Sequence, residues 1–536
     1  MTLVAAPLRL CLLSLLAACS GSGKGPELFG AGTDLDGDHS TVEEGDCDDA
    51  DPDQSPAATE IPGDGIDQNC DASDGGPVYD LGDANGSWVG DEDYRNVGYG
   101  VASGGDLDGD GVQDVVIGAP YETRPEGDER VSLAGAIFIA RGPPAPGVSL
   151  ADPVGWVEET YSTTHFGESI TPGRDADGDG YDDLLYGAIL TAHGNPHAAL
   201  LTGPILGARD ASSADWTLIQ AQDDTGGNDV EIFTADLDGG EASLLIGIAG
   251  EAYGGPGHAL VFPGTSTGAQ DTPDAATRYI GEFDHDAFGL TVAVVGDADG
   301  DGIAELAFGA PEVEADLAGG TDPDALPDSA HFAGAAYVAS GDERGEVLIA
   351  DVGAAWLGTS RYEEAGAALS PAGDLDGDGY DDLLVGASFS DEYGDAAGRA
   401  WLVLGPFVGR RSLNDAPITL TPEGLYERLG WRVVGAGDVD GDGTPDLALS
   451  APREAHDTSY PGKVYLYTGL VSGTYGGADA DLVLVGEDPG DWAGGGLSGG
   501  VDLNDDGYSD LVIGAAFNSE GGQDAGKVYV VYGFDL

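Results

Sequence analysis

Six segments of the sequence share the pattern D-x-D-x-D-G-x-x-D, whose carboxylate spacing suits a metal ion. In the first copy the acids at positions 1, 3, 5 and 9 are Asp106, Asp108, Asp110 and Asp114. Side chains at these positions can converge on one point, the glycine permits a sharp turn, and the backbone carbonyl of Val112 at position 7 supplies another oxygen. A ligand set made only of oxygen atoms indicates calcium rather than a softer metal.

The pattern returns five times in the same register. Asn504 replaces one acid in the last copy, which keeps an oxygen but loses a charge, and a further copy at Asp236 is degenerate and expected to hold no ion. One such loop could be merely structural, because Asp also caps turns. Six copies predict about six calcium ions, because clustered carboxylates repel one another unless a cation lies among them. The expected ligands, with position 7 again contributing its carbonyl, are Asp175, Asp177, Asp179, Tyr181 and Asp183; Asp297, Asp299, Asp301, Ile303 and Glu305; Asp374, Asp376, Asp378, Tyr380 and Asp382; Asp438, Asp440, Asp442, Thr444 and Asp446; and Asp502, Asn504, Asp506, Tyr508 and Asp510.

The overall charge agrees with cation binding. The 536 residues include 98 acids against 19 lysines and arginines, a formal net charge of -79. Such a surface repels phosphate backbones, which excludes a nucleic-acid binder. Because 41% of the residues are hydrophobic, the chain has the material for a folded core. If each site has the millimolar-range affinity of extracellular modules, six ions add about 8 kcal/mol, so we expect calcium to be structural.

Three repeated elements predict the fold. First acids of successive loops are 61 to 77 residues apart, and a glycine-led strand such as GKVYLYTG also occurs seven times. A third element, a short apolar strand, precedes the first loop around Trp88 but does not follow the last one. Several short strands per repeat of this length are typical of β-propeller blades. We therefore expect an all-β, seven-bladed β-propeller over residues 87–536, in which the strand near Trp88 completes the last blade and closes the ring.

The loops and strands together resemble the FG-GAP repeat family, whose best-known member is the seven-bladed propeller of integrin α subunits. Phe166-Gly167, Phe288-Gly289 with Gly309-Ala310-Pro311, and Leu429-Gly430 carry the resemblance. It implies that the calcium loops use positions 1, 3, 5, 7 and 9, and that a ligand binds on the propeller face opposite these loops. We expect the phenylalanines of these pairs, and Trp492, to pack between blades rather than to stack on a ligand.

The N-terminus has the features of an export signal. Arg9 precedes the apolar run 10–16, and the four residues that end at Cys19 resemble the lipobox of bacterial lipoproteins. This predicts a signal peptide over residues 1–18, lipid attachment to Cys19, a flexible tether over 19–33, and an anchor in the bacterial cell envelope, at the outer membrane. The alternative is an ordinary secretory signal in which the cysteine is incidental.

Residues 34–76 are rich in carboxylates and poor in apolar side chains. Asp34, Asp36 and Asp38 offer hard oxygen ligands on one side of a turn. The segment resembles the MopE-type metal-binding motif and, more loosely, the thrombospondin type 3 calcium repeat, and we expect calcium rather than copper here; a disordered acidic spacer is the alternative. Outside the cytoplasm, Cys47 and Cys70 are expected to form a disulfide rather than a thiolate metal site.

No residue pattern in the chain indicates catalysis. The histidines are scattered, and His193 and His197 enclose Gly194 and Pro196, which disfavours the helix that a zinc protease would need. We therefore expect a non-enzymatic adhesion or ligand-binding module whose partner is an extracellular protein or glycan and whose membrane contact is the lipid anchor alone. The alternatives are a propeller enzyme that acts on extracellular polysaccharide and a purely structural scaffold.

Overall fold

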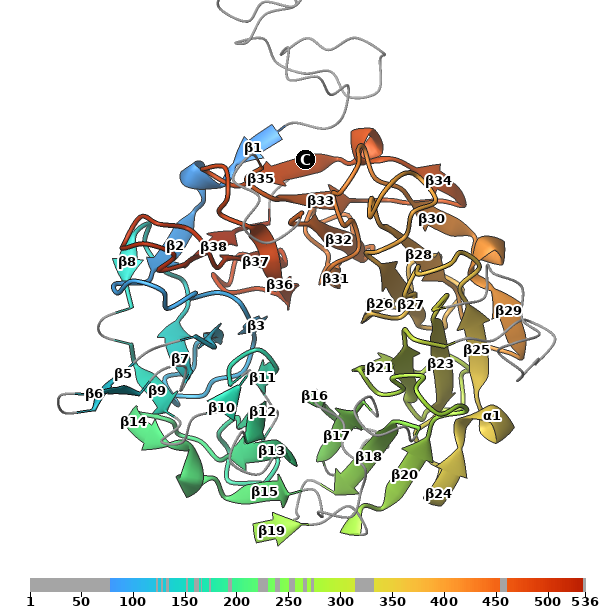
Figure 1. Ribbon diagram of the computed structural model, residues 1–536, viewed down its shortest axis with the longest axis horizontal. Helices are drawn as coiled ribbons and strands as arrows, with labels where there is room; N and C mark the ends of the chain where they lie inside the picture. Colours follow the sequence, from blue (N-terminus) through green and yellow to red (C-terminus); the bar gives the residue numbers. More distant parts are fainter. Residues whose placement is uncertain are drawn as a thin grey trace, which may run out of the picture. The chain divides into compact units, whose positions relative to one another are not determined.

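Each sequence repeat forms one antiparallel sheet of the protein, and seven such sheets follow one another around a ring (Figure 1). The computed structural model describes residues 78–533, all within one compact unit, apart from the gaps at 122–123, 127–128, 132–134, 151–152, 159–162, 165, 173–174, 191–194, 220–229, 237–241, 250–255, 264–267, 271–273, 314–331 and 454–459. The residues expected to form the signal peptide, tether, acidic segment and disulfide lie outside these ranges.

Each sheet, or blade, contains four antiparallel strands, numbered here from the centre of the ring outward and named after the metal loop that follows its innermost strand. Inner strands of neighbouring blades contact one another around the whole ring. The strands are β3 (Val101–Ser103), β4 (Asp114–Ala119), β7 (Ala136–Arg141) and β9 (Gly155–Glu158) in blade 1; β11 (Ile170–Pro172), β12 (Leu184–Leu190), β13 (Asn195–Leu201) and β15 (Trp216–Ile219) in blade 2; β16 (Val230–Asp236), β17 (Ala242–Ile248), β18 (His258–Pro263) and β20 (Thr277–Ile280) in blade 3; β21 (Thr291–Gly296), β22 (Glu305–Ala310), β23 (Ala335–Ser340) and β25 (Ala354–Leu357) in blade 4; β26 (Ala368–Gly373), β27 (Asp382–Ala387), β28 (Arg399–Val403) and β30 (Ile418–Leu420) in blade 5; β31 (Val433–Gly437), β32 (Asp446–Ala451), β33 (Lys463–Tyr467) and β35 (Leu482–Val485) in blade 6; and β36 (Ala493–Val501), β37 (Asp510–Ala515), β38 (Lys527–Val531) and β2 (Gly86–Val89) in blade 7.

Blade 7 closes the ring as the sequence predicts. Its outer strand β2 comes from the N-terminal side and pairs antiparallel with β38, where Trp88 lies opposite Val528. The predicted all-β, seven-bladed fold is therefore confirmed. Because its first and last repeats share one sheet, the propeller leaves no terminal blade with an unpaired edge.

A fifth strand, which the sequence analysis did not predict, joins every blade to the next. Just before the outer strand of each blade, the chain forms a short strand parallel to the outer edge of the preceding blade; in blade 7 both of these strands come from the N-terminal side. The fifth strands are β14 (Gly207–Asp210) on β9, β19 (Gly268–Gln270) on β15, β24 (Gly345–Leu348) on β20, β29 (Arg410–Ser412) on β25, β34 (Gly473–Tyr475) on β30, β1 (Val78–Asp80) on β35 and β8 (Val148–Ser149) on β2.

Short helical turns follow most of these fifth strands, and they explain why the propeller unit begins before residue 87. The turn after β1 is capped by Asp80, whose carboxylate accepts a hydrogen bond from the Gly82 N–H, just as Asp210 caps the turn after β14. The remaining elements are the helix α1 (Ile349–Val352), the 3-10 turns η2 (Leu81–Asp83), η3 (Ala211–Ser213), η6 (Leu413–Asp415) and η7 (Gly477–Asp479), the hairpin of β5 (Arg124–Glu126) and β6 (Glu129–Val131), and β10 (Thr163–Thr164), which pairs with β12.

The hydrophobic core lies between the blades. Second strands such as β4 are buried along their whole length, because a neighbouring sheet covers each face. Phe166 and Phe288 are fully buried and Trp492 is 4% exposed, which confirms that these aromatic residues pack between blades. Among the described residues, no helix has the length and hydropathy needed to cross a membrane.

Glycines allow the blades to approach one another closely at the end of the ring remote from the metal loops. The Gly98 N–H donates to the Gly118 carbonyl within blade 1, while Gly118 itself faces the next blade. A methyl group added to Gly118 would lie 1.7 Å from the Gly167 carbonyl oxygen, and one on Gly386 would lie 2.4 Å from that of Gly430. No other residue fits such a contact, which is the physical reason for the recurring glycines in both halves of the motif.

Candidate metal centres and the opposite face

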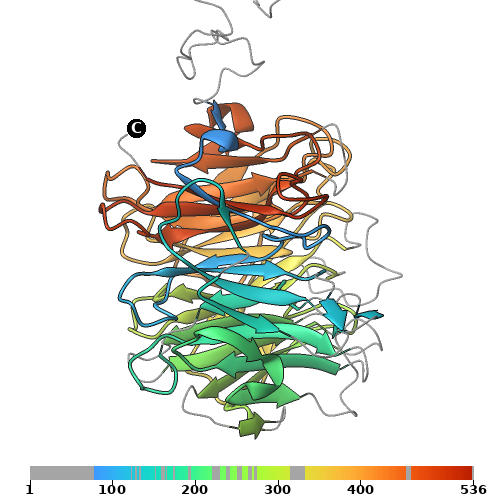
Figure 2. The same cartoon turned by 90° about the vertical axis from the view of Figure 1, so that its left-hand side faces the viewer.

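The predicted metal loops all lie at one face of the ring. Each joins the inner strand of a blade to the second strand, so all follow the same strand end; Figure 2 views the ring from the side, with its two faces at left and right. Each loop also rests on its neighbour: the Asp106 N–H donates to Asp182 Oδ2 of the next blade at 2.8 Å, and the Ser509 N–H donates to the Asp438 carbonyl at the same distance. Loop geometry and blade contacts are therefore coupled at this face.

Hydrogen bonds from the backbone give each loop its form. In blade 1, Asp106 Oδ1 accepts from the N–H groups of Gly109 and Asp110, and its Oδ2 accepts from Gly111. Asp108 Oδ1 also accepts from the Asp110 N–H, and Asp110 Oδ1 accepts from that of Val112. The same bonds recur in the other intact loops, so the acids at positions 1, 3 and 5 turn the backbone around a common centre.

Five of the six loops bring three carboxylates together. In each of them one oxygen from every acid lies within 4.8 Å of the others. Among the described residues, the last loop forms no such group, because Asn504 replaces an acid and its amide donates to Asp506 Oδ2 at 2.8 Å. The clusters are Asp106, Asp108 and Asp114; Asp175, Asp177 and Asp183; Asp297, Asp299 and Glu305; Asp374, Asp376 and Asp378; and Asp438, Asp440 and Asp442.

The acid at position 9 is buried in all six loops. Burial, with the negative charge of Asp108 next in effect, raises the pKa of Asp114 to about 7. Burial likewise raises the pKa of Glu305, Asp382 and Asp446 to about 7, and that of Asp183 and Asp510 to about 6. Burial makes the charged form of these carboxyls unfavourable. A neighbouring cation favours that charged form and would therefore stabilise these carboxyls the most.

Unpaired oxygens in the loops fit a bound cation. Asp114 Oδ1, Glu305 Oε1, Asp438 Oδ1 and Asp446 Oδ1 are buried and accept no hydrogen bond from any residue that the structure describes. A buried acceptor without a donor is costly, and a divalent ion would supply the missing partner. Because every candidate donor is an oxygen, the loops suit a hard divalent cation.

One loop contains a basic side chain that the sequence analysis missed. Arg141, the last residue of β7, places its Nε 2.6 Å from Asp108 Oδ2 and 3.1 Å from Asp110 Oδ2. Strand pairing brings it there, since Arg141 lies opposite Asp114, whereas in blade 4 the residue opposite Glu305 is Ser340. The guanidinium is thus an internal counter-cation for loop 1.

Several expected sites fall outside the described side chains. They are the degenerate loop that follows Asp236, the candidate ligands Asp34, Asp36 and Asp38, the lipidation site Cys19 and the cysteine pair Cys47 and Cys70. They remain predictions.

The opposite face displays aromatic residues on strained backbone. Tyr94, Tyr362 and Tyr426 stand at the same place in three loops that join one blade to the next; all have positive φ and are between 43% and 49% exposed. Non-glycine residues rarely adopt this conformation, and such strain is concentrated at functional sites. Each tyrosine begins the pattern Tyr-x-x-x-Gly, which ends at Gly98, Gly366 or Gly430, and this shared pattern is a signal that the sequence analysis did not use.

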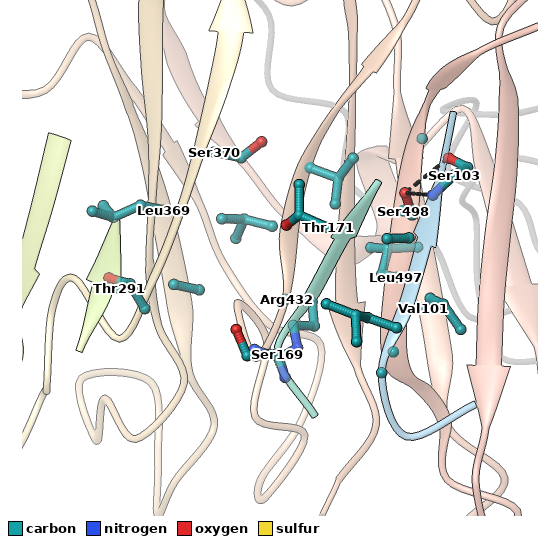
Figure 3. A pocket seen from close by; sticks show the side chains of 18 of the residues that line it. Val101, Ser103, Ser169, Thr171, Thr291, Leu369, Ser370, Arg432, Leu497 and Ser498 are labelled. Atoms are coloured by element: carbon teal, nitrogen blue, oxygen red, sulfur yellow. Dashed lines mark hydrogen bonds between the residues drawn. The ribbon is translucent and has the colours of Figure 1, made fainter. Parts of the chain in front are cut away.

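A cavity of about 500 Å³ opens among the inner strands of the ring (Figure 3). Its walls come from blades 1, 2, 4, 5, 6 and 7 and contain mostly small and hydroxyl side chains. Arg432 and Glu168 are the charged residues of this lining.

Comparison with known proteins agrees with this architecture. The FG-GAP repeat family matches residues 97–134, 365–403, 430–467 and 493–531, within blades 1, 5, 6 and 7, and a metal-binding motif of the MopE type matches residues 46–74. The chain is thus a seven-bladed propeller with FG-GAP repeats, preceded by a MopE-type motif. The predicted resemblances to FG-GAP repeats and to the MopE-type motif are confirmed.

Curated relatives of this chain include integrin α subunits. Human integrin alpha-IIb is 37% identical over 148 residues, 26% of this chain and 14% of that protein, and Xenopus laevis integrin alpha-4 is 31% identical over 197 residues, 34% and 17%. The matches therefore span less than a fifth of those integrins. Among solved structures, the match to BBS1N in complex with ARL6DN, soaked with lead, covers 84% of this chain and 94% of the other at 10% identity, with a TM-score of 0.37.

Proposed function

We propose that this protein is a calcium-stabilised binding module on the bacterial cell envelope, that it recognises an extracellular ligand, and that it catalyses no reaction. The observation that carries the proposal is the division of the propeller into two faces: one holds five triplets of carboxylates, and the other displays tyrosines on strained loops. Relatedness to integrin α subunits supports a ligand-binding or adhesive role.

Calcium is the proposed occupant of the metal loops. The side chains at positions 1, 3, 5 and 9 of each loop, and the carbonyl at position 7, would hold the calcium ion. In the first loop these residues are Asp106, Asp108, Asp110, Val112 and Asp114. The ion would neutralise buried carboxylates and thereby fix the loops against the neighbouring blades. We propose five or six ions in the propeller, with the loop at Asn504 the weakest, and further ions in the segment 34–76.

Lipid attachment at Cys19 is the proposed link to the membrane, with residues 20–33 as tether. Metabolic labelling with a palmitate analogue in a bacterial expression host tests it. The native chain should incorporate the label and Cys19→Ser should not. Equal labelling of both would remove the anchor from the proposal.

Ligand capture from cell-envelope extracts tests the binding function. The purified native protein is immobilised and incubated with envelope proteins and with a glycan array, in calcium and in excess EGTA. We expect one class of ligand to be retained in calcium and lost in EGTA, because the loops on both faces belong to the same sheets. Failure to retain any ligand in calcium would favour a structural scaffold, and turnover of a polysaccharide would favour an enzyme.

A further inference from the structure

The cavity in the middle of the ring has a lining unlike the rest of this acidic protein. The chain has about five acids for each basic residue, yet among the described residues Glu168 is the only carboxylate that lines the cavity. Four serines and two threonines line it with Arg432 and Tyr99. Its volume of about 500 Å³ lies within the range of small-molecule sites.

Arg432 is the basic residue of this lining, and it forms no ion pair with the carboxylate of Glu168, which lines the same cavity. Among the described residues its guanidinium has no hydrogen-bond or ion-pair partner, although the chain carries 98 acids. Other arginines do pair with acids; Arg399, for example, pairs with the buried Glu363. A half-buried guanidinium that stays unpaired in so acidic a chain can bind an anionic group of a ligand, since arginine binds carboxylates through two parallel hydrogen bonds.

The position of Arg432 places this anion site at the face opposite the metal loops. Arg432 immediately precedes β31, and the metal loop of blade 6 follows the other end of that strand. Ser169 precedes β11 in the same way, and Figure 3 shows both side chains at one end of the cavity, with Ser103 and Ser370 at the other. Ser169 Oγ is buried and has no hydrogen-bond partner in the described part of the chain, so it too can bond to a ligand.

Hydroxyl groups and Tyr99 continue the polar surface around Arg432. Thr171 and Thr291 lie on inner strands of blades 2 and 4, and Ser103 and Ser498 bond to each other across blades 1 and 7 at 2.9 Å. Hydroxyls that both donate and accept suit the alternating hydroxyls of a sugar, and the aromatic ring of Tyr99 in the lining suits its apolar face. A metal cation does not suit the site, because the guanidinium repels it.

We propose that this cavity binds a uronic-acid unit of an acidic polysaccharide, with its carboxylate on Arg432 and its hydroxyls on Ser169 and the neighbouring hydroxyl side chains. The proposal rests on the ligand-binding function proposed above and names the ligand class and the site. The ring geometry favours one chain end or a short bend of the polymer as the ligand, since inner strands of six blades line the cavity.

Calorimetric titration with trigalacturonate in calcium tests the site. Native protein should bind it, and its fully methyl-esterified form, which lacks the charge, should bind at least tenfold more weakly. Arg432→Gln should lose about 10- to 100-fold in affinity for the acid form, the range of a charged hydrogen bond, and little for the ester. Arg432→Lys should fall between native protein and Arg432→Gln, because it keeps the charge without the bidentate geometry.

Arg361→Gln is the matched control. Arg361 belongs to the same face, but it stacks on Tyr362 with its Cζ 4.5 Å from the ring centroid and does not line the cavity. The affinity of Arg361→Gln for trigalacturonate should stay within twofold of that of the native protein. Equal melting temperatures in calcium should show that Arg432→Gln and Arg361→Gln are both folded. Equal losses in Arg432→Gln and Arg361→Gln would assign binding to general charge and overturn the site.

Other outcomes separate this inference from the proposed function. No binding of trigalacturonate by native protein, or native-like binding by Arg432→Gln, overturns the site, while ligand capture from the envelope would still stand. A hexa-aspartate peptide that binds more tightly than trigalacturonate and is lost in Arg432→Gln would overturn the saccharide assignment in favour of an acidic peptide.

Discussion

The two faces of this propeller are joined in different ways. At the metal-loop face, acids such as Asp106 and Asp438 contact the next blade through loops in which several buried carboxylate oxygens accept no hydrogen bond from the described residues. At the opposite end, Gly118 and Gly386 press directly on the backbone of the next blade. One end of each blade junction therefore depends on a cation and the other on close packing. Cation removal and glycine substitution should separate these two contributions.

Removal of calcium should produce the largest effect and should act on one face. Five or six sites that each add about 1.4 kcal/mol predict a fall in melting temperature of about 8 °C in excess EGTA. Hydrogen exchange should accelerate in the metal loops, while the N–H groups of Gly98, Gly289 and Gly430, which donate within the glycine contacts, stay protected. An unchanged melting temperature would contradict a structural role of the ion. Equal loss of protection at both ends would show that the glycine contacts depend on the cation as much as the metal loops do.

The pH dependence should reverse when calcium is removed. Asp114, Glu305 and Asp382 have folded pKa values of about 7, above the unfolded value near 4, so without calcium the folded state binds more protons between these limits. Stability in EGTA should therefore fall as pH rises from about 4 through 7. With calcium the same acids must be charged, so stability should fall as pH decreases. The difference in melting temperature between calcium and EGTA should thus shrink by roughly half or more from pH 8 to pH 5; a constant difference would contradict this linkage.

Gly118→Ala should weaken the opposite end. The added methyl group would lie 1.7 Å from the Gly167 carbonyl oxygen, so the two blades must separate, at a cost of about 3 kcal/mol by chemical denaturation. Gly473→Ala is a suitable control, because its methyl group would meet nothing closer than 3.5 Å. The loss should be the same in calcium and in EGTA. A loss seen only in calcium would show that the two ends are coupled.

Asp382→Asn should remove one ion and little else. Asp382 accepts from the N–H groups of Leu375 and Gly405, both at 3.0 Å, and the amide can replace only one of these acceptors and carries no charge. We expect the calcium stoichiometry to fall by one and stability in calcium to fall by about 2 kcal/mol. Asp415→Asn, outside any metal loop, should change neither. An unaltered stoichiometry would exclude position 9 as a ligand.

The difference between the faces also explains what the sequence could and could not predict. All ligands of a metal loop lie within nine residues, so Asp106, Asp108 and Asp114 meet through local hydrogen bonds that a motif records. The closing strand at Trp88 was predictable because one copy of the short apolar strand precedes the first repeat, whereas the last repeat lacks its copy. Phe166 and Phe288 were assigned to the core from their repetition, and both are fully buried.

The features that the sequence did not predict depend on residues from different repeats. β1 contributes only three residues and pairs with β35 about 400 positions away, so no periodic signal marks it. Arg432 and Ser169 come from blades 6 and 2 and share a cavity only because the ring closes. Arg141 reaches loop 1 through the register of β4 and β7, which a motif confined to the loop does not contain.

Arg141 makes loop 1 the exception within the metal face, and its replacement should have the smallest effect. Its Nε lies between Asp108 and Asp110, the acids at positions 3 and 5, so an incoming ion must displace it. The Asp108 hydrogen bond and then its charge raise the pKa of Arg141, so the guanidinium stays charged at any accessible pH. Loop 1 should therefore bind calcium less tightly than the loop at Asp297, where Ser340 takes the corresponding position.

Arg141→Ser copies the blade 4 arrangement into blade 1. Because exposed ion pairs contribute little, we expect calcium affinity at one site to rise by about two- to fivefold, seen by calorimetry as one weak site that joins the tighter group. Arg411→Ser, which removes an arginine that packs over Trp356 away from the loops, should leave all affinities unchanged. If Arg141→Ser also leaves them unchanged, the guanidinium moves aside without cost and loop 1 is equivalent to the others. If calorimetry instead shows one calcium ion fewer, Arg141 positions the ligands of loop 1. The guanidinium then assists calcium binding rather than competing with it.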